Sequence, residues 1–183
     1  GDLSINVAGS IADPVAGRGV DLHLQARDPD LSTSLALLGN GAPASGTLAI
    51  DAKVIGNYDA LALQRLELTL KTANSIDVRA VGDIADLQTL SGIALTVSGR
   101  VDDAEIWQWL TVGKLRGIQR GQFSGALTGD ARDLRVTDMS LEMTANSDLV
   151  LALRGHVEVD LKSRSLGDSA LDLALTLAAP KLA

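Results

Sequence analysis

The sequence predicts a mostly β fold, namely a curved antiparallel repeat sheet shaped like a groove, with about ten strands and two short helices. Three observations predict it. Apolar and polar residues alternate over most of the chain, the tetrapeptide Thr72 to Ser75 recurs as Thr144 to Ser147, and glycines recur at the evenly spaced positions 9, 82 and 155. Such a long period is typical of repeat architectures, in which each unit contacts mainly its neighbours.

Strict alternation places the apolar residues of a strand on one face of a sheet and the polar residues on the other. One dry and one wet face is typical of antiparallel sheets, and the short spacing between the runs favours hairpin connections. We expect the apolar positions of the clearest strands to form one continuous apolar surface: Leu66, Leu68, Leu70, Ile76, Val78, Ile93, Leu95, Val97, Leu149, Leu151, Leu153, Leu171, Leu173 and Leu175.

Two segments break the alternation and predict the helices. In the first, Pro29 follows Asp28, and leucines recur with helical spacing over residues 31–38, before Gly39. In the second, Asp102 and Glu105 have the spacing of a capping box, and apolar residues follow as far as residue 110. Taking positions 30 and 103 as equivalent, the two helices are separated by the same interval as the glycines.

The predicted unit is strand, strand, short helix, strand, strand. Residues 1–183 then form a single repetitive β-groove segment, with repeat 1 at about 1–73, repeat 2 at about 74–146 and a partial repeat 3 at about 147–183. Gly46-Thr47-Leu48 corresponds to Gly125-Ala126-Leu127 at a longer interval than the glycines, which predicts that the stretch after the helix has grown by a few residues. Because both ends fall inside the pattern, we expect the chain to be a fragment of a longer protein.

Composition excludes several classes of function. The net charge is −7 and no basic run is present, so a nucleic-acid partner is not expected. No apolar stretch reaches the ~18 residues of a membrane-spanning helix. Hydrophobic residues make up 46% of the chain but aromatic residues only 2%, so its apolar surface is aliphatic. The chain has no cysteine, and therefore no disulfide or thiolate metal site.

No group of residues predicts catalysis. His23 and His156 are expected on the polar side of their strands, and Asp28, Asp30, Asp102 and Asp103 lack the spacing of a calcium loop. No phosphate-binding loop or nucleophile motif is present. The sequence therefore predicts no catalytic residue, no metal and no cofactor, and a protein that is not an enzyme.

The order of elements resembles a known family. Strand Gly92 to Gly99, helix Ala104 to Leu110, connector Gly121 to Gly125 and strand Leu141 to Ser147 are similar to the C-terminal repeat region of the AsmA-like proteins of Gram-negative bacteria, relatives of TamB. The resemblance implies a periplasmic protein that is held in the inner membrane by an N-terminal anchor absent from this sequence. It also implies a groove that carries the acyl chains of phospholipids between the inner and outer membranes, and a partner at the outer membrane.

Two architectures remain open from the pattern. Alternation alone fits a closed β-sandwich or barrel, whose leucine faces pack on each other, as well as it fits an open groove. The repeat favours the open array. A closed core would suit the alternative function, which is a structural or scaffolding β-domain that aids outer-membrane protein assembly or envelope integrity.

Overall fold

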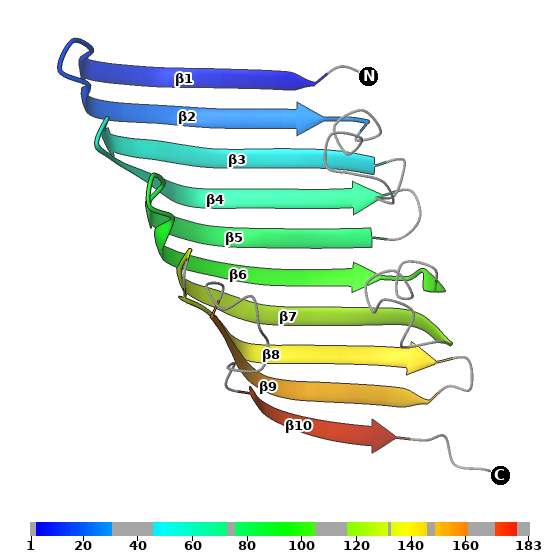
Figure 1. Cartoon of the computed structure of the whole chain (residues 1–183). Helices are drawn as coiled ribbons and strands as arrows, with labels where there is room; N and C mark the ends of the chain where they lie inside the picture. The colour runs from blue at the N-terminus through cyan, green and yellow to red at the C-terminus, as the bar shows by residue number, and fades with distance from the viewer. Residues whose placement is uncertain are drawn as a thin grey trace.

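The computed structural model describes residues 3–30, 46–72, 76–104, 117–131, 133–145, 149–160 and 171–178. These residues form one antiparallel sheet in which the strands follow each other in chain order, from β1 at one edge to β10 at the other (Figure 1). The strands are β1 (Ser4–Asp13), β2 (Arg18–Asp28), β3 (Gly46–Asn57), β4 (Ala60–Thr72), β5 (Ile76–Asp86), β6 (Ser91–Val101), β7 (Ile118–Asp130), β8 (Asp133–Ala145), β9 (Val150–Asp160) and β10 (Leu171–Ala178).

The prediction of a mostly β, antiparallel protein is confirmed, and the sheet is open. Consecutive strands pair throughout the described residues, as hairpin connections require. Residues 31–38 of the first predicted helix and 105–110 of the second lie outside the described part of the chain, and Ala104, where the second is expected to begin, has helical conformation. Within the described part, all the elements are strands.

The backbone conformation repeats along the chain at a constant offset in residue number. Gly9, Gly82 and Gly155 have φ angles of 144°, 146° and 154°, and their numbers differ by 82 − 9 = 73 and again by 155 − 82 = 73. The same offset separates other residues with positive φ: Gly19 and Gly92 (67° and 63°), Gly56 and Gly129 (125° and 124°), and Arg65 and Asp138 (50° and 51°). Positive φ is uncommon outside glycine. The recurrence of positive-φ residues at one offset therefore shows that strands β5–β8 repeat the conformation of β1–β4.

The tight turns at one end of the sheet repeat as well. The Asp13 carboxylate accepts hydrogen bonds from the backbone N–H groups of residues 15 and 16, and the Asp86 carboxylate accepts them from residues 88 and 89. The N–H of Tyr58 donates to the Gly17 carbonyl, just as that of Ala131 donates to the Leu90 carbonyl. Aspartate is suited to these positions because its short side chain satisfies backbone donors within the turn.

Two expectations about the repeat need correction. The longer interval from Gly46 to Gly125 is wrong, because Gly56 and Gly129 occupy equivalent positions at the common offset, which places the equivalent of Gly46 at the start of β7, where Ile118 pairs with Ala145 as Gly46 pairs with Thr72. The repeated tetrapeptide is one residue out of step with the fold. Its second copy begins at Thr144, whereas the equivalent of Thr72 at the end of β4 is Ala145 at the end of β8.

The described residues contain only a small core. Val101, Ile118 and Met143 form a buried cluster, with Ile76, Leu141 and Leu151 packed against it at one end of β5–β9. No described large side chain is less than 2% exposed. The chain exposes 11922 Å² in all, whereas a compact protein of its mass exposes about 8,400 Å². The sheet is therefore extended, and it encloses only a small buried core.

Candidate functional site: one apolar face of the sheet

The strand register brings apolar residues from successive strands to one side of the sheet, which we call the apolar face. Residues that pair directly across two strands lie on the same face. One row of such partners crosses the sheet from β1 to β7: Ile5, Ala26, Ile50, Leu68, Ala80, Val97 and Gly125. A second row joins Met139 in β8 to Gly155 in β9 and Leu173 in β10.

The register places the predicted surface residues together on this face. In β4–β6, Leu70 pairs with Val78, and Gly82 pairs with both Leu66 and Leu95. In β9 and β10, the position of Leu153 pairs with that of Leu175. Leu149 precedes β9, and its carbonyl accepts a hydrogen bond from the N–H of Ala145. The positions predicted in β10 are assigned to the face from their backbone pairing alone.

The sequence analysis missed a comparable number of apolar-face residues in β1–β3, β7 and β8. The signal for β2 and β3 was present as alternation, but shorter than in the leucine-rich strands. In β8, the pattern changes phase between Val136 and Met139, which hides the strand from a search for strict alternation. The main additions are Ile5, Val7, Leu22, Leu24, Leu48, Ile50, Val54, Phe123, Leu127, Leu134, Val136, Met139, Leu141 and Met143.

Two β-bulges keep the apolar face continuous. The β4–β5 register skips between Leu63 and Leu66, and the β8–β9 register skips between Val136 and Met139. An extra residue in a strand would send the following side chains to the opposite face, but a bulge absorbs it. Positive φ at Arg65 and Asp138 marks the bulged residues. The leucines before and after each bulge therefore share one face.

Exposure varies along the apolar face. At the edge strand β1, Ile5 is 61% exposed and Val7 is 54% exposed. Most apolar-face residues of β4–β6 are half-buried. Val20, Ala52, Val101, Ile118 and Met143 are the buried hydrophobic residues of the described chain. Within the described residues, no second sheet packs on this face.

The opposite face carries most of the charges, many of them paired across strands; Asp28 at the end of β2 is a buried exception, because it pairs with Leu48 of the apolar face. Lys53 Nζ lies 2.8 Å from Asp21 Oδ2, and an Arg79 nitrogen lies 2.8 Å from Glu67 Oε1. Exposed pairs of this kind contribute about 1 kcal/mol or less each. Because these charged side chains remain hydrated, their face stays in contact with water, and the apolar residues lie on the other face.

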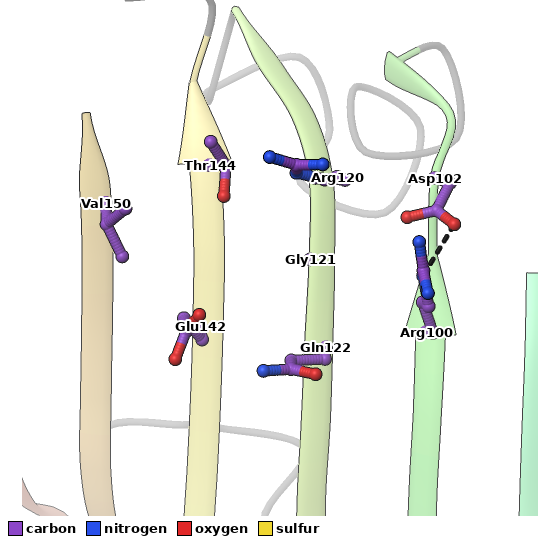
Figure 2. A pocket seen from close by; sticks show the side chains of 8 residues that line it. All are labelled: Arg100, Asp102, Arg120, Gly121, Gln122, Glu142, Thr144 and Val150. Carbon is purple, nitrogen blue, oxygen red and sulfur yellow. Dashed lines mark ion pairs between the residues drawn. The ribbon is translucent and has the colours of Figure 1, made fainter. Parts of the chain in front are cut away.

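Shallow hollows also open on the polar face. One is lined by residues of β6–β9, including Arg100, Arg120 and Glu142 (Figure 2). The guanidinium of Arg100 reaches along its own strand to Asp102, where its Nε lies 2.6 Å from Oδ2, and this hydrogen bond raises the pKa of Arg100. The hollow combines both signs of charge and is open to solvent, so it defines no particular ligand.

The histidines lie on the polar face, as predicted. His23 Nε2 lies 2.7 Å from Asp51 Oδ1, and Gln25 Nε2 donates to Asp51 Oδ2 at 2.8 Å. His156 is exposed in β9, next to Gly155 of the apolar face. In the described part of the chain, no group of three or more histidine, cysteine, aspartate or glutamate residues could hold a metal ion.

Replacement of Gln25 by alanine is expected to raise the pKa of Asp51. The hydrogen bond from Gln25, and then that from His23, holds this pKa below its usual 3.8. The carboxylate therefore stabilises the fold at pH above 3.8, and this contribution is lost as the pH falls through the lowered pKa. Carboxyl NMR titration should show the Asp51 midpoint moving toward 3.8. The midpoint of Asp86, lowered by Thr89 and Gln88, should stay in place; an Asp51 midpoint that does not move contradicts the assignment.

Comparisons with known proteins add no assignment. No family model matches the chain, and no curated protein or solved structure matches it. Among the described residues, no helix is long and apolar enough to cross a membrane. The apolar face is therefore the feature on which a functional proposal has to rest.

Proposed function

We propose that the apolar face binds the acyl chains of a phospholipid or a similar lipid. The observation that carries this proposal is the pairing register, which aligns aliphatic side chains from β1 to β10 on one face. Leucine, isoleucine and valine make up most of the face, and Phe123 is the single phenylalanine of the chain. An aliphatic surface of this kind can contact a hydrocarbon chain without holding the chain at one position.

The dimensions and energies suit an acyl chain. A strand of eleven residues such as β5 or β6 is about 36 Å long at ~3.3 Å per residue, longer than an extended acyl chain of ordinary length. Each methylene removed from water contributes ~0.8 kcal/mol. Ten methylenes contribute about 8 kcal/mol in this approximation, divided among many small contacts. A lipid would thus leave water readily and still slide along the surface.

We also propose that the chain is a segment of an AsmA-like bridge protein in the periplasm, without catalytic function. The family resemblance supports this proposal, and so does the open antiparallel repeat sheet, because that is the architecture the family implies. In this proposal the sheet curves into a groove around the acyl chains. The full-length protein is anchored in the inner membrane, meets a partner at the outer membrane and carries phospholipid between them.

Lipid transfer between vesicles tests the proposal. Donor vesicles contain phosphatidylethanolamine with a fluorophore on its acyl chain and a quencher lipid, and acceptor vesicles contain neither. The purified chain should accelerate the rise in fluorescence in proportion to its concentration. Organic extracts of the purified protein should contain phospholipid by mass spectrometry. Absence of both transfer and bound lipid would contradict the proposal.

A scaffolding role is the second candidate, and the exposed edge strand β1 favours it. All ten residues of β1 are exposed, so the strand is open to another polypeptide. If the chain assists outer-membrane protein assembly, an unfolded barrel protein should cross-link to it in place of lipid. Cross-linking to such a substrate, together with no lipid transfer, would favour this candidate.

A further inference from the structure

The free edge of β1 is long and unprotected. Among the residues that the structure describes, β1 pairs with β2 alone, and it lies at the outer edge of the sheet (Figure 1). Edge strands are usually protected by lysine, proline or charges directed toward the apolar side. β1 contains no lysine or proline, and its one charged residue is Asp13 at its end. The edge is therefore suited to pairing with a further strand.

The repeat indicates which strand fits. Gly9 in β1 has the conformation of Gly82 in β5 and Gly155 in β9. Each of those strands has a neighbour on the side where β1 has none: β4 for β5, and β8 for β9. The edge of β1 is thus equivalent to two edges whose occupants are known in detail.

Those two occupants share one register. Gly82 pairs with Leu66, and Gly155 pairs with Met139. Next along the strands, Ala80 pairs with Leu68 and Leu153 with Leu141, followed by the pairs Val78 with Leu70 and Leu151 with Met143. Both occupants also carry a bulge just before the residue that pairs with the glycine, with φ of 50° at Arg65 and 51° at Asp138.

We propose that the free edge of β1 binds an antiparallel, bulged strand of the β4 and β8 type. A leucine or methionine of the incoming strand would pair with Gly9, and apolar residues two and four positions later would pair with Val7 and Ile5. The half-exposed Ile5 and Val7 would gain apolar neighbours, and main-chain hydrogen bonds would add to the affinity.

A second copy of this chain fits the edge less well. In each copy, β4 and β8 are paired on both sides, so neither can be offered to another molecule without breaking the sheet. The other free edge is β10, whose register with β9 shows no bulge. The proposed occupant is therefore a segment with the β4 and β8 pattern other than the ten described strands. It binds to the sheet edge, so this proposal can be tested independently of lipid binding.

The test uses a labelled peptide with the sequence of residues 133–145, titrated into the full chain and followed by fluorescence anisotropy. The peptide should bind, and replacing its Met139 and Leu141 by lysine should weaken Kd by about tenfold or more, since these side chains would pair with Gly9 and Val7. Lysine in place of Ser140, which belongs to the polar face, should leave Kd within about twofold.

Backbone methylation and cross-linking identify the site. In a peptide paired by one edge, N-methylation of alternate residues should abolish binding for one set of positions and spare it for the other, because only one set donates to β1. A photo-cross-linking residue in place of Asn6 in β1 should capture the peptide, and one in place of Thr176 in β10 should not. Equal sensitivity of both methylated sets, capture at Thr176 without capture at Asn6, or dimers joined through β1 that exclude the peptide would each overturn the proposal.

Discussion

Replacement of Leu95 by aspartate is expected to reduce phospholipid transfer by about tenfold or more. Leu95 lies in the middle of β6 on the apolar face, half-buried, and pairs with Gly82 on one side and Leu127 on the other. A carboxylate there would have to lose its hydration whenever an acyl chain covered it, and an unpaired buried charge is strongly unfavourable. The measurement is the initial rate of transfer between vesicles.

The matched control is the neighbouring residue on the other face. Thr96 follows Leu95 in the same strand, is exposed, and pairs with Val81 and Ala126. Thr96→Asp adds the same charge at almost the same place in the fold, so it should leave the transfer rate within about twofold if only the apolar face contacts lipid. Equal loss in both variants would contradict the assignment of the lipid surface.

A third variant separates lipid contact from folding. Leu95→Met keeps the apolar character and nearly the volume of the side chain, a change that usually costs less than about 1.5 kcal/mol. It should transfer lipid at close to the original rate. Circular dichroism of the three variants shows whether the sheet is intact, and an unfolded Leu95→Asp chain would be replaced in the test by Leu95→Gln.

The apolar face could be predicted from the sequence because strand geometry depends on a period of two. Alternating apolar residues in β4, β6 and β9 can point to only one side of a sheet, whatever the rest of the chain does. The bulges could not be predicted in the same way. They appear in the sequence only as one extra residue, between Leu63 and Leu66 or between Val136 and Met139, and the same change of phase is produced by a loop.

Some of the recurring glycines coincide with the offset at which the backbone conformation repeats, and others do not. Gly9, Gly82 and Gly155 have positive φ angles that other residues adopt only with strain. Their spacing therefore follows the interval at which the backbone conformation repeats. Gly46 and Gly125 carry no such constraint, and their apparent correspondence led to the wrong interval. The two copies of the tetrapeptide are separated by one residue less than the structural offset for a related reason. No particular backbone conformation requires these four residue types.

Whether the apolar face is open depends on contacts between segments distant in sequence, which alternation does not encode. A sandwich and an open sheet have the same pattern of leucines. The distinction comes from the strand order, in which every strand from β2 to β9 is paired with its two sequence neighbours. In such an array each strand is stabilised mainly by the next one, so local backbone fit has a large influence on stability.

Replacement of Gly82 by alanine is therefore expected to destabilise the sheet by about 3 kcal/mol or more. A Cβ atom at this position would lie 2.0 Å from the carbonyl oxygen of Ala94 and 2.9 Å from the Cα of Leu95, both backbone atoms of β6. The φ angle of 146° is also unfavourable for alanine. Because β5 and β6 lie in the middle of the sheet, the loss should appear as a lower midpoint of urea unfolding.

Two further glycines provide the controls. Gly125→Ala should cost less than about 1 kcal/mol, because the nearest atom to its Cβ would be the side-chain Cγ1 of Val136, at 3.1 Å. Gly9→Ala has nearly the same clash as Gly82→Ala, at 2.1 Å from the Asp21 carbonyl oxygen, but in the edge strand. Hydrogen exchange should then show β1 losing protection while β4–β8 keep theirs. If Gly9→Ala lowers the midpoint as much as Gly82→Ala, the sheet unfolds as one unit and the nearest-neighbour description of its stability is wrong.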